Sequence, residues 1–263
     1  MVNKNLPWLV LLIFLNLTLN AQYNHFKVDI QKDLVLSFSA GITFAGGLYF
    51  KNKTPLPTSR DINILNKSQL NSFDRKVFNL PYQNKLLLSD LVLAGTGIAS
   101  VSMLAVREAR EDFLPLVIIY FQSISFTSGL TSISKATFMR FRPYVYEKNI
   151  SSTKNSRDAV HSFFSGHTSS AAAFSFTSAY TFTRYIESNV IDNIIWGLAA
   201  IVPAYTGYLR MVSRKHFPTD IIIGYIVGGS IGIIIPKIHE IKTNNENVNL
   251  GLTGSGFYFT FNF

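Results

Sequence analysis

The chain has 263 residues, of which 48% are hydrophobic and only 15% charged. Because a soluble domain is typically about 25% charged, this composition favours a membrane protein of one or at most two domains. The net charge of +9 suits anionic partners such as phosphate groups or lipid head groups. We expect no nucleic acid partner, because no basic stripe is interleaved with exposed polar sequence, and the absence of cysteine excludes disulfides and cysteine-based zinc sites.

Residues 1–21 are predicted to be a signal peptide or an N-terminal anchor. Lys4 provides the positive start, residues 6–19 the apolar run, and Leu19-Asn20-Ala21 a cleavage site. The apolar run is short for a membrane span, which needs about 20 residues, so cleavage is favoured over an uncleaved anchor.

Residues 22–85 are predicted to form an N-terminal segment and a polar loop. Within them, residues 33–50 are apolar but rich in glycine and serine, so they either span the membrane or lie against other helices. Residues 51–85 are polar and contain Pro55 and Pro57, which indicates a loop with short helices.

Residues 86–236 are predicted to form the helical core. The apolar stretches 86–106, 113–134, 168–185, 194–208 and 221–235 are each expected to be helical. The fold class is therefore all-α, a membrane-associated bundle of five or six apolar helices with the active site at helix ends. The small residues from Ser169 to Ala173 allow close helix packing.

Residues 237–263 are predicted to be a C-terminal tail. Phe257, Phe259, Phe261 and Phe263 alternate with more polar residues, which is strand periodicity. A single such strand makes no barrel, and we expect the tail to pack at the membrane surface.

The first polar cluster runs from Lys135 to Arg142-Pro143. Lys135 and Arg142 are two helical turns apart and share a face, and Pro143 marks the end of the helix. Two cations there suit a phosphate, because an arginine can bind two oxygens at once. Taken alone, this cluster is better explained by cations that snorkel at a membrane interface.

The second cluster is Ser165-Gly166-His167, just before a predicted helix. Gly166 allows close backbone approach to a ligand, and helix N-terminal N–H groups attract anions. His167 would lie beside them and could donate a proton. A capped helix start with an incidental histidine explains this cluster alone equally well.

The third cluster joins the last two apolar stretches and contains Arg210, His216, Pro218 and Asp220. Pro218 fits the first position of a helix, so Asp220 lies in its first turn and His216 just before it. A carboxylate there can accept a hydrogen bond from one ring nitrogen of His216 and leave the other free to attack. Arg210 adds positive charge for a transferring phosphoryl group. A positively charged membrane hairpin is the weaker alternative.

Together the three clusters resemble the type 2 phosphatidic acid phosphatase family. The family pattern is Lys, six residues, Arg-Pro; then Pro-Ser-Gly-His; then Ser-Arg, five residues, His, three residues, Asp. All three spacings occur here in order, over roughly residues 86–235. Two positions differ, because Phe164 replaces the proline of the second motif and Leu209 the serine before Arg210. The second change removes a potential phosphate hydrogen bond, which concerns rate and substrate preference more than the class of reaction.

The resemblance implies a role for each matching residue. It implies that His216 attacks phosphorus to form a phosphohistidine, that Asp220 orients His216, and that His167 protonates the leaving oxygen. It also implies no metal and no cofactor. The residues implied to hold the phosphate oxygens are Lys135, Arg142, Ser165, Gly166 and Arg210. The other histidines, His25, His161 and His239, are interpreted as surface residues, although His161 is close enough in sequence to line the pocket.

The implied enzyme is an acid phosphatase-type hydrolase of phosphoric esters that acts on a lipid-linked phosphate monoester or diphosphate. Its partners would be that lipid and the membrane. Vanadium haloperoxidases have a similar pocket pattern and are an alternative, as is a membrane transporter or structural protein with an inactive site. The resemblance implies a site that faces the periplasm from a bacterial-type inner membrane. That orientation requires that residues 33–50 do not span, and it places the basic loop 51–85 outside, against the positive-inside rule.

Overall fold

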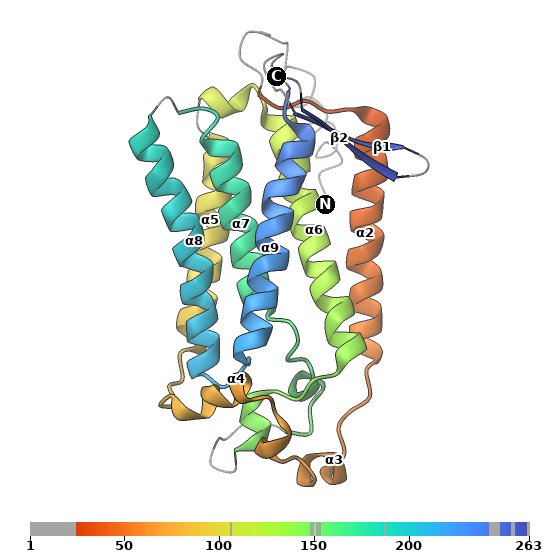
Figure 1. The fold of residues 1–263 in the computed structure, drawn as a ribbon, viewed down its shortest axis with the longest axis vertical. Helices are drawn as coiled ribbons and strands as arrows, with labels where there is room; N and C mark the ends of the chain where they lie inside the picture. Colours follow the sequence, from red (N-terminus) through yellow and green to blue (C-terminus); the bar gives the residue numbers. More distant parts are fainter. Residues whose placement is uncertain are drawn as a thin grey trace, which may run out of the picture.

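The structure is a computed structural model that describes residues 25–105, 107–147, 150, 154–186, 188–241, 248–253 and 256–261. The predicted signal segment, residues 1–21, and Phe263 lie outside these residues. Six long helices stand side by side in one bundle (Figure 1). They are α2 (Ile30–Lys53), α5 (Leu86–Ser102), α6 (Phe113–Phe138), α7 (Gly166–Phe182), α8 (Asn189–Val212) and α9 (Pro218–His239).

Short elements occupy the two ends of the bundle. Between α2 and α5 lie α3 (Ser59–Asn63), η1 (Lys67–Gln69), α4 (Ser72–Arg75) and η2 (Lys76–Asn79). The remaining 3-10 helices are η3 (Met103–Ala105), η4 (Glu108–Arg110), η5 (Pro143–Tyr146) and η6 (Arg157–Val160). In the tail, β1 (Val248–Thr253) pairs antiparallel with β2 (Gly256–Phe261), which confirms the predicted strand character there.

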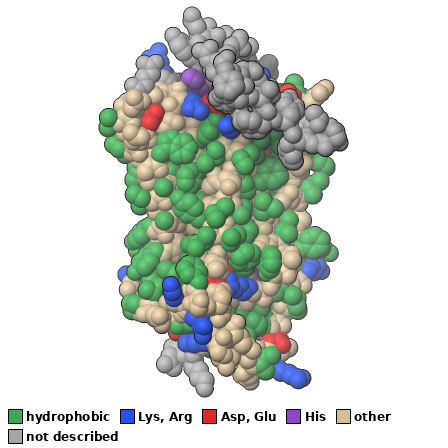
Figure 2. Space-filling view, viewed as in Figure 1, with side chains coloured by type: hydrophobic (Ala, Val, Ile, Leu, Met, Phe, Trp, Pro, Cys, Tyr) green, Lys and Arg blue, Asp and Glu red, His purple; other side chains and the backbone are tan. Residues whose placement is uncertain are grey.

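The bundle has the dimensions and surface of a membrane protein. Among the described residues, four helices are long and apolar enough to cross a bilayer, namely α2, the helix containing α6, α8 and α9, while α5 is a shorter apolar helix. Hydrophobic side chains cover the middle of the molecule, and lysine and arginine gather towards its ends (Figure 2). The predicted all-α membrane bundle is therefore confirmed. The stretch whose role was open, residues 33–50, is part of the full-length helix α2.

Helix α7 is the centre of the bundle, in contact with α5, α6, α8 and α9. Its small residues are the reason that four helices can surround it, because they allow close backbone approach. Ser169, Ala171, Ala172 and Ala173 are each 0% exposed. The predicted run of small residues is thus a packing surface.

A row of glycines fixes the axial position of α9 relative to α7. A Cβ atom added at Gly228 would lie 2.0 Å from the carbonyl oxygen of Ser169, and one at Gly224 would lie 2.7 Å from that of Ser165. Gly232, one turn further on, makes a similar approach, at 2.9 Å from a carbonyl oxygen of α7. Any side chain at these positions would push the helices apart. The row therefore holds the second turn of α9 beside the start of α7.

Helices α2 and α6 run parallel and in close contact. A Cβ atom at Gly47 would lie 2.6 Å from the carbonyl oxygen of Gly129, and one at Gly129 would lie 2.6 Å from the backbone of Thr43. The C-terminal ends of both helices consequently lie at the same end of the bundle, the lower end in Figure 1. Residue 25, which precedes α2, belongs to the opposite end, where the backbone of Lys27 bonds to His239.

Candidate active site

The residues predicted to form the site belong to helix ends and connections at the lower end of the bundle in Figure 1. They come from the end of α6, the connection 139–165, the start of α7, the end of α8 and the turn before α9. The connection 54–85 packs at the same end, since Thr54 bonds to His161 and Gln83 to Val212. The residues brought together are Lys135, Arg142, Ser165, Gly166, His167, Arg210, His216 and Asp220.

His216 is 1% exposed, and each ring nitrogen has one close partner. Nδ1 lies 2.7 Å from the carbonyl oxygen of Ser162, and Nε2 lies 3.1 Å from Nη1 of Arg142. A carbonyl can only accept and a guanidinium can only donate, so the proton of the neutral ring belongs on Nδ1. The Nε2 atom then carries a lone pair directed towards the cations of the site.

The surroundings of His216 keep this ring neutral. Burial lowers its pKa well below the ordinary value, and the nearby charges of Arg142, Arg210 and Lys135 lower that pKa further. A histidine nucleophile must be unprotonated to attack, so this environment suits nucleophilic catalysis at neutral pH.

Asp220 does not make the direct hydrogen bond to His216 that the sequence predicts. Its Oδ2 atom is 3.8 Å from Nδ1 of His216, beyond hydrogen-bonding distance. That oxygen instead accepts from the hydroxyl of Ser162 at 2.6 Å and from the backbone N–H of Phe217 at 2.8 Å. The physical reason is that the Ser162 carbonyl occupies the Nδ1 position, while Asp220 caps the first turn of α9.

Arg142 is held rigidly next to His216. Its Nε atom donates to the carbonyl oxygen of Asp158 at 2.7 Å, Nη2 donates to the Asp158 carboxylate at 2.8 Å, and Nη1 donates to the carbonyl oxygen of Lys215 at 2.8 Å. Burial opposes ionisation of Asp158, but Arg142 and Lys215 outweigh it and hold the pKa of Asp158 well below its ordinary value. The guanidinium is thus fixed by a carboxylate that sequence reasoning did not identify.

The start of α7 presents unpaired donors. The hydroxyl of Ser165 caps the helix by accepting from the N–H of Thr168, and its own N–H donates to the carbonyl oxygen of Asp220 at 3.0 Å. In the described part of the chain, the backbone N–H groups of Gly166 and His167 have no acceptor. The helix begins at Gly166 rather than at the predicted Thr168, because Ser165 is the cap. Free N–H groups at a helix N-terminus are a ready anion site.

The amine of Lys135 lies over this helix start. A Cβ atom placed on Gly166 would be 3.4 Å from it, which puts the amine directly beside the first residue of α7. No hydrogen bond or ion pair to the Lys135 amine is present within the described residues. A half-buried ammonium group without a partner is costly, and a bound phosphate would satisfy it.

His167 is paired with a carboxylate from α5. Its Nε2 atom lies 2.7 Å from Oδ1 of Asp90, which also lies 3.4 Å from Nη1 of Arg210. The same Nη1 donates to the hydroxyl of Ser89 at 3.0 Å, while the buried Nε of Arg210 has no partner among the described residues. Sequence reasoning missed Ser89 and Asp90. The signal that could have found them is a carboxylate near the start of an apolar helix, which is costly unless it has a function or a partner.

Two of the histidines that were interpreted as surface residues are buried, so that interpretation was wrong for them. His161 is 3% exposed and its Nε2 atom lies 2.9 Å from the hydroxyl of Thr54. His239 is 1% exposed and pairs with Asp33 at the opposite end of the bundle. In the described ranges, no group of three or more His, Asp, Glu or Cys side chains converges as a set of metal ligands.

Comparison with known proteins points to one family. Residues 116–244 match the model of the PAP2 superfamily. Two solved structures are similar to the chain. LpxE from Aquifex aeolicus is 21% identical, with 62% of this chain and 92% of that chain covered and a TM-score of 0.42. A transmembrane PAP2-type phosphatidylglycerolphosphate phosphatase from Bacillus subtilis is 17% identical, with 89% and 96% covered and a TM-score of 0.42. No curated protein sequence matches significantly.

Proposed function

We propose, from the premise that the chain belongs to the PAP2 superfamily, that it is a membrane phosphatase that removes phosphate from a lipid-linked monoester or diphosphate. The observation that carries this proposal is the set of unpaired donors around the Nε2 atom of His216, which carries the lone pair of the ring. These donors are the amine of Lys135, the backbone N–H groups at the start of α7 and the buried Nε of Arg210. Their charge and direction suit one phosphoryl group in contact with His216.

In the proposed reaction His216 is the nucleophile. Its Nε2 lone pair forms a bond to phosphorus while the bond from phosphorus to the leaving oxygen breaks, and His167 gives a proton to that oxygen. A water molecule then attacks phosphorus, the bond to His216 breaks, and His167 accepts the proton from the water. The proton that His167 gave in the first step is thereby returned in the second.

We propose that the positive charge for this reaction comes from the protein rather than from a metal ion. Arg142 lies 3.1 Å from the nucleophilic nitrogen, and Lys135 and Arg210 also act electrostatically on His216. Three cations can stabilise the charge that develops on the transferring phosphoryl oxygens.

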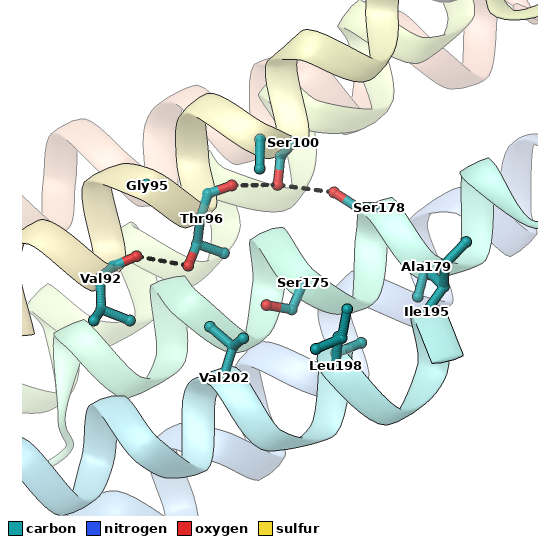
Figure 3. Close-up of a pocket in the computed structure, with 12 residues that line it drawn as sticks. Val92, Gly95, Thr96, Ser100, Ser175, Ser178, Ala179, Ile195, Leu198 and Val202 are labelled. Carbon is teal, nitrogen blue, oxygen red and sulfur yellow. Dashed lines mark hydrogen bonds between the residues drawn. The ribbon is translucent and has the colours of Figure 1, made fainter. Parts of the chain in front are cut away.

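The case for a lipid substrate rests on a groove between α5, α7 and α8, with a volume of about 410 Å³. It begins near the site, because Val92 follows Asp90 by two residues and Val202 precedes Arg210 by two helical turns. Of its four lining hydroxyl groups, those of Thr96, Ser100 and Ser178 bond within the protein, as Figure 3 shows. The surface left to a ligand is therefore largely hydrocarbon, which suits a lipid chain.

The test uses purified wild type and His216→Ala in detergent. Phosphate release is measured from phosphatidate, phosphatidylglycerol phosphate, undecaprenyl diphosphate and a lipid A phosphate, with and without chelator, beside a water-soluble phosphate ester. We expect release by the wild type, none by the variant, no effect of chelator, and a higher kcat/KM for the lipids than for the soluble ester.

Each failure has a distinct meaning. Loss of activity with chelator would overturn metal independence, and equal kcat/KM for the soluble ester would overturn the lipid substrate. Folded wild-type protein that releases phosphate from none of these compounds would overturn the phosphatase proposal itself.

We further propose that the site faces the periplasm. Since α2 spans the length of the bundle, the site and residue 25 are on opposite faces, so this orientation places residue 25 in the cytoplasm. It then requires that residues 1–21 do not export the start of the mature chain, against the signal or anchor predicted from the sequence. The chain has no cysteine, so single-cysteine variants report sidedness cleanly. With a membrane-impermeant maleimide on intact bacterial cells, we expect labelling of Ser68→Cys at the site end and protection of Asn189→Cys at the other. The reverse pattern would place the site in the cytoplasm.

A further inference from the structure

The carboxylate of Asp220 is enclosed by groups that the proposed reaction does not use. It is 0% exposed, and its Oδ1 atom accepts from Nη1 of Arg140 at 2.6 Å. Arg140 also stacks over the ring of Phe217, with 4.3 Å between the guanidinium carbon and the ring centroid. The guanidinium is therefore held in place and can fix the direction of the carboxylate.

A second carboxylate holds Arg140 from the other side. Asp74 in α4 is 0% exposed, and its Oδ2 atom accepts from Nη2 of Arg140 at 2.6 Å. Asp74 also accepts from the backbone N–H of Thr219 at 3.0 Å, and from the hydroxyl of Thr219 and the amide of Asn71. One arginine thus bridges two buried carboxylates that are 146 positions apart in the chain.

Ser162 connects the same carboxylate to the nucleophile. Its hydroxyl donates to Oδ2 of Asp220 at 2.6 Å, and its carbonyl oxygen accepts from Nδ1 of His216 at 2.7 Å. Ser162 is 0% exposed, so water does not compete for either bond. Asp220 therefore reaches His216 through Ser162.

We propose that Asp74, Arg140 and Ser162 are positioning residues of the catalytic site, and that the N-terminal connection 54–85 is thereby part of its machinery. The chain of contacts runs from Asp74 through Arg140 to Asp220, and from Asp220 through Ser162 to His216. This inference rests on the proposed function only where its test measures catalytic activity. Its consequence is that a substitution in α4, which is far from His216 in the sequence, changes the direction of the His216 ring.

A purely structural role makes a different prediction. Asp74 accepts from the N–H of Thr219 in the first turn of α9, so it could merely stabilise the start of that helix. In that case its removal would lower the stability of the protein independently of Asp220. If Asp74 acts through Asp220, its removal has no further effect once Asp220 has lost its charge.

The experiment is a double-mutant cycle of Asp74→Asn and Asp220→Asn in the full chain. We expect Asp74→Asn to lower kcat by about 10- to 100-fold with little change in KM, as for other groups that orient a catalytic residue. The double variant should be no slower than Asp220→Asn alone. The matched control is Asp61→Asn, because Asp61 lies in the same connection and caps α3 through Thr58. We expect this control to leave kcat unchanged.

A readout that needs no turnover separates this inference from the proposed function. Orthovanadate resembles a phosphoryl group, and its Kd can be measured by calorimetry on the same four proteins. We expect the same non-additive pattern in Kd, even if no lipid phosphate proves to be a substrate. Additive losses in kcat and Kd would overturn the inference.

A second cycle covers the case in which Asp74→Asn does not fold. Ser162→Ala removes one hydroxyl and keeps the carbonyl that faces His216. We expect a fall in kcat that vanishes in the Asp220→Asn background, with no change in melting temperature beyond that of Asp61→Asn. An unchanged kcat for folded Ser162→Ala would overturn its place in the chain of contacts.

Discussion

Helix α9 has a buried histidine at each end, His216 just before its first residue and His239 as its last. Both side chains are 1% exposed, and both lie near a carboxylate, Asp220 in one case and Asp33 in the other. The two rings differ in what faces their nitrogens. His216 has a carbonyl on one side and the guanidinium of Arg142 on the other. His239 has the carbonyl oxygen of Ile235 on one side and the carboxylate of Asp33 on the other.

The contrast shows that the partners of a buried histidine, rather than its burial, decide what it can do. Both nitrogens of His239 lie against oxygens of the protein, so that ring offers no lone pair to a ligand. The donor beside Nε2 of His216 leaves a lone pair there. One end of the helix therefore has a structural ion pair, supported by Gln122, and the other has a nucleophile.

The largest expected effect separates these two histidines. His216→Ala should lower kcat/KM by roughly 10⁴-fold or more, as expected for removal of a nucleophile. His239→Gln should leave kcat/KM within a few-fold of wild type and lower the melting temperature, because it breaks the buried pair with Asp33. Phosphate release and thermal unfolding are measured on both variants. Equal loss of activity in the two folded variants would contradict the assignment of His216 as the nucleophile and His239 as a structural residue.

A smaller effect is expected from the packing that keeps the two ends in their places. Gly228→Ala puts a methyl group where only 2.0 Å is available next to the carbonyl oxygen of Ser169, so α9 must move relative to α7. We expect a loss of about 1–3 kcal/mol in the free energy of unfolding, together with reduced kcat, because His216 moves with the helix. The control is Gly197→Ala in α8, where no atom lies within 4 Å of the new methyl group. That variant should be as stable as wild type or more stable, since alanine is the better helix former.

The same contrast explains which parts of the site could be predicted from the sequence. One family pattern covers Lys135, Arg142, Arg210 and His216. The prediction that Lys135 and Arg142 share one helix face was wrong, because α6 ends at Phe138 and Arg142 lies in the extended connection before η5. Asp74 and Asp90 could not be placed, because each reaches its partner across more than 60 residues of chain, and only the packing of α4 and α5 brings them there.

The helices were predictable for a related reason. Apolar length fixes the helical stretches, and the predicted bundle is confirmed. Whether residues 33–50 span or lie against other helices could not be decided from composition, since glycine and serine fit both. The structure shows both, because α2 is long enough to cross a bilayer and Gly47 and Gly129 let it pack closely against α6. His161 and His239 were wrongly predicted to be surface residues, because their partners, Thr54 and Asp33, are distant in the sequence.

A further prediction concerns the carboxylate that faces the second histidine of the site. Asp90→Asn keeps the shape of the side chain but removes the charge that bonds to Nε2 of His167 and approaches Arg210. We expect kcat to fall by about 10- to 100-fold, because His167 loses the partner that orients it and favours its protonated form. Substrates with a good leaving group, which need no proton, should lose less. A fall of equal size for good and poor leaving groups would show that Asp90 serves Arg210 rather than His167.

The smallest expected effect is a pH dependence of stability that comes from the histidines at the site end of the bundle. At the site end, the pKa of His161 is lowered to about 4, first by burial and then by Lys135, Lys51 and Arg142. Between pH 4 and the ordinary histidine pKa of about 6.5, the unfolded chain binds a proton at this position that the folded chain does not. The free energy of unfolding therefore decreases as the pH falls through this window, by at most about 1.4 kcal/mol per pH unit for one group.

His161→Gln tests this, because glutamine can still bond to Thr54 but does not titrate. The melting temperature of the variant in detergent should fall less steeply than that of wild type between pH 7 and pH 5. Some dependence should remain, because the pKa of His216 is also lowered by burial and by the cations beside it. A slope identical to that of wild type would mean that His161 is not held neutral by the cations of the site. The pH dependence of stability at the site end would then come from His216 alone.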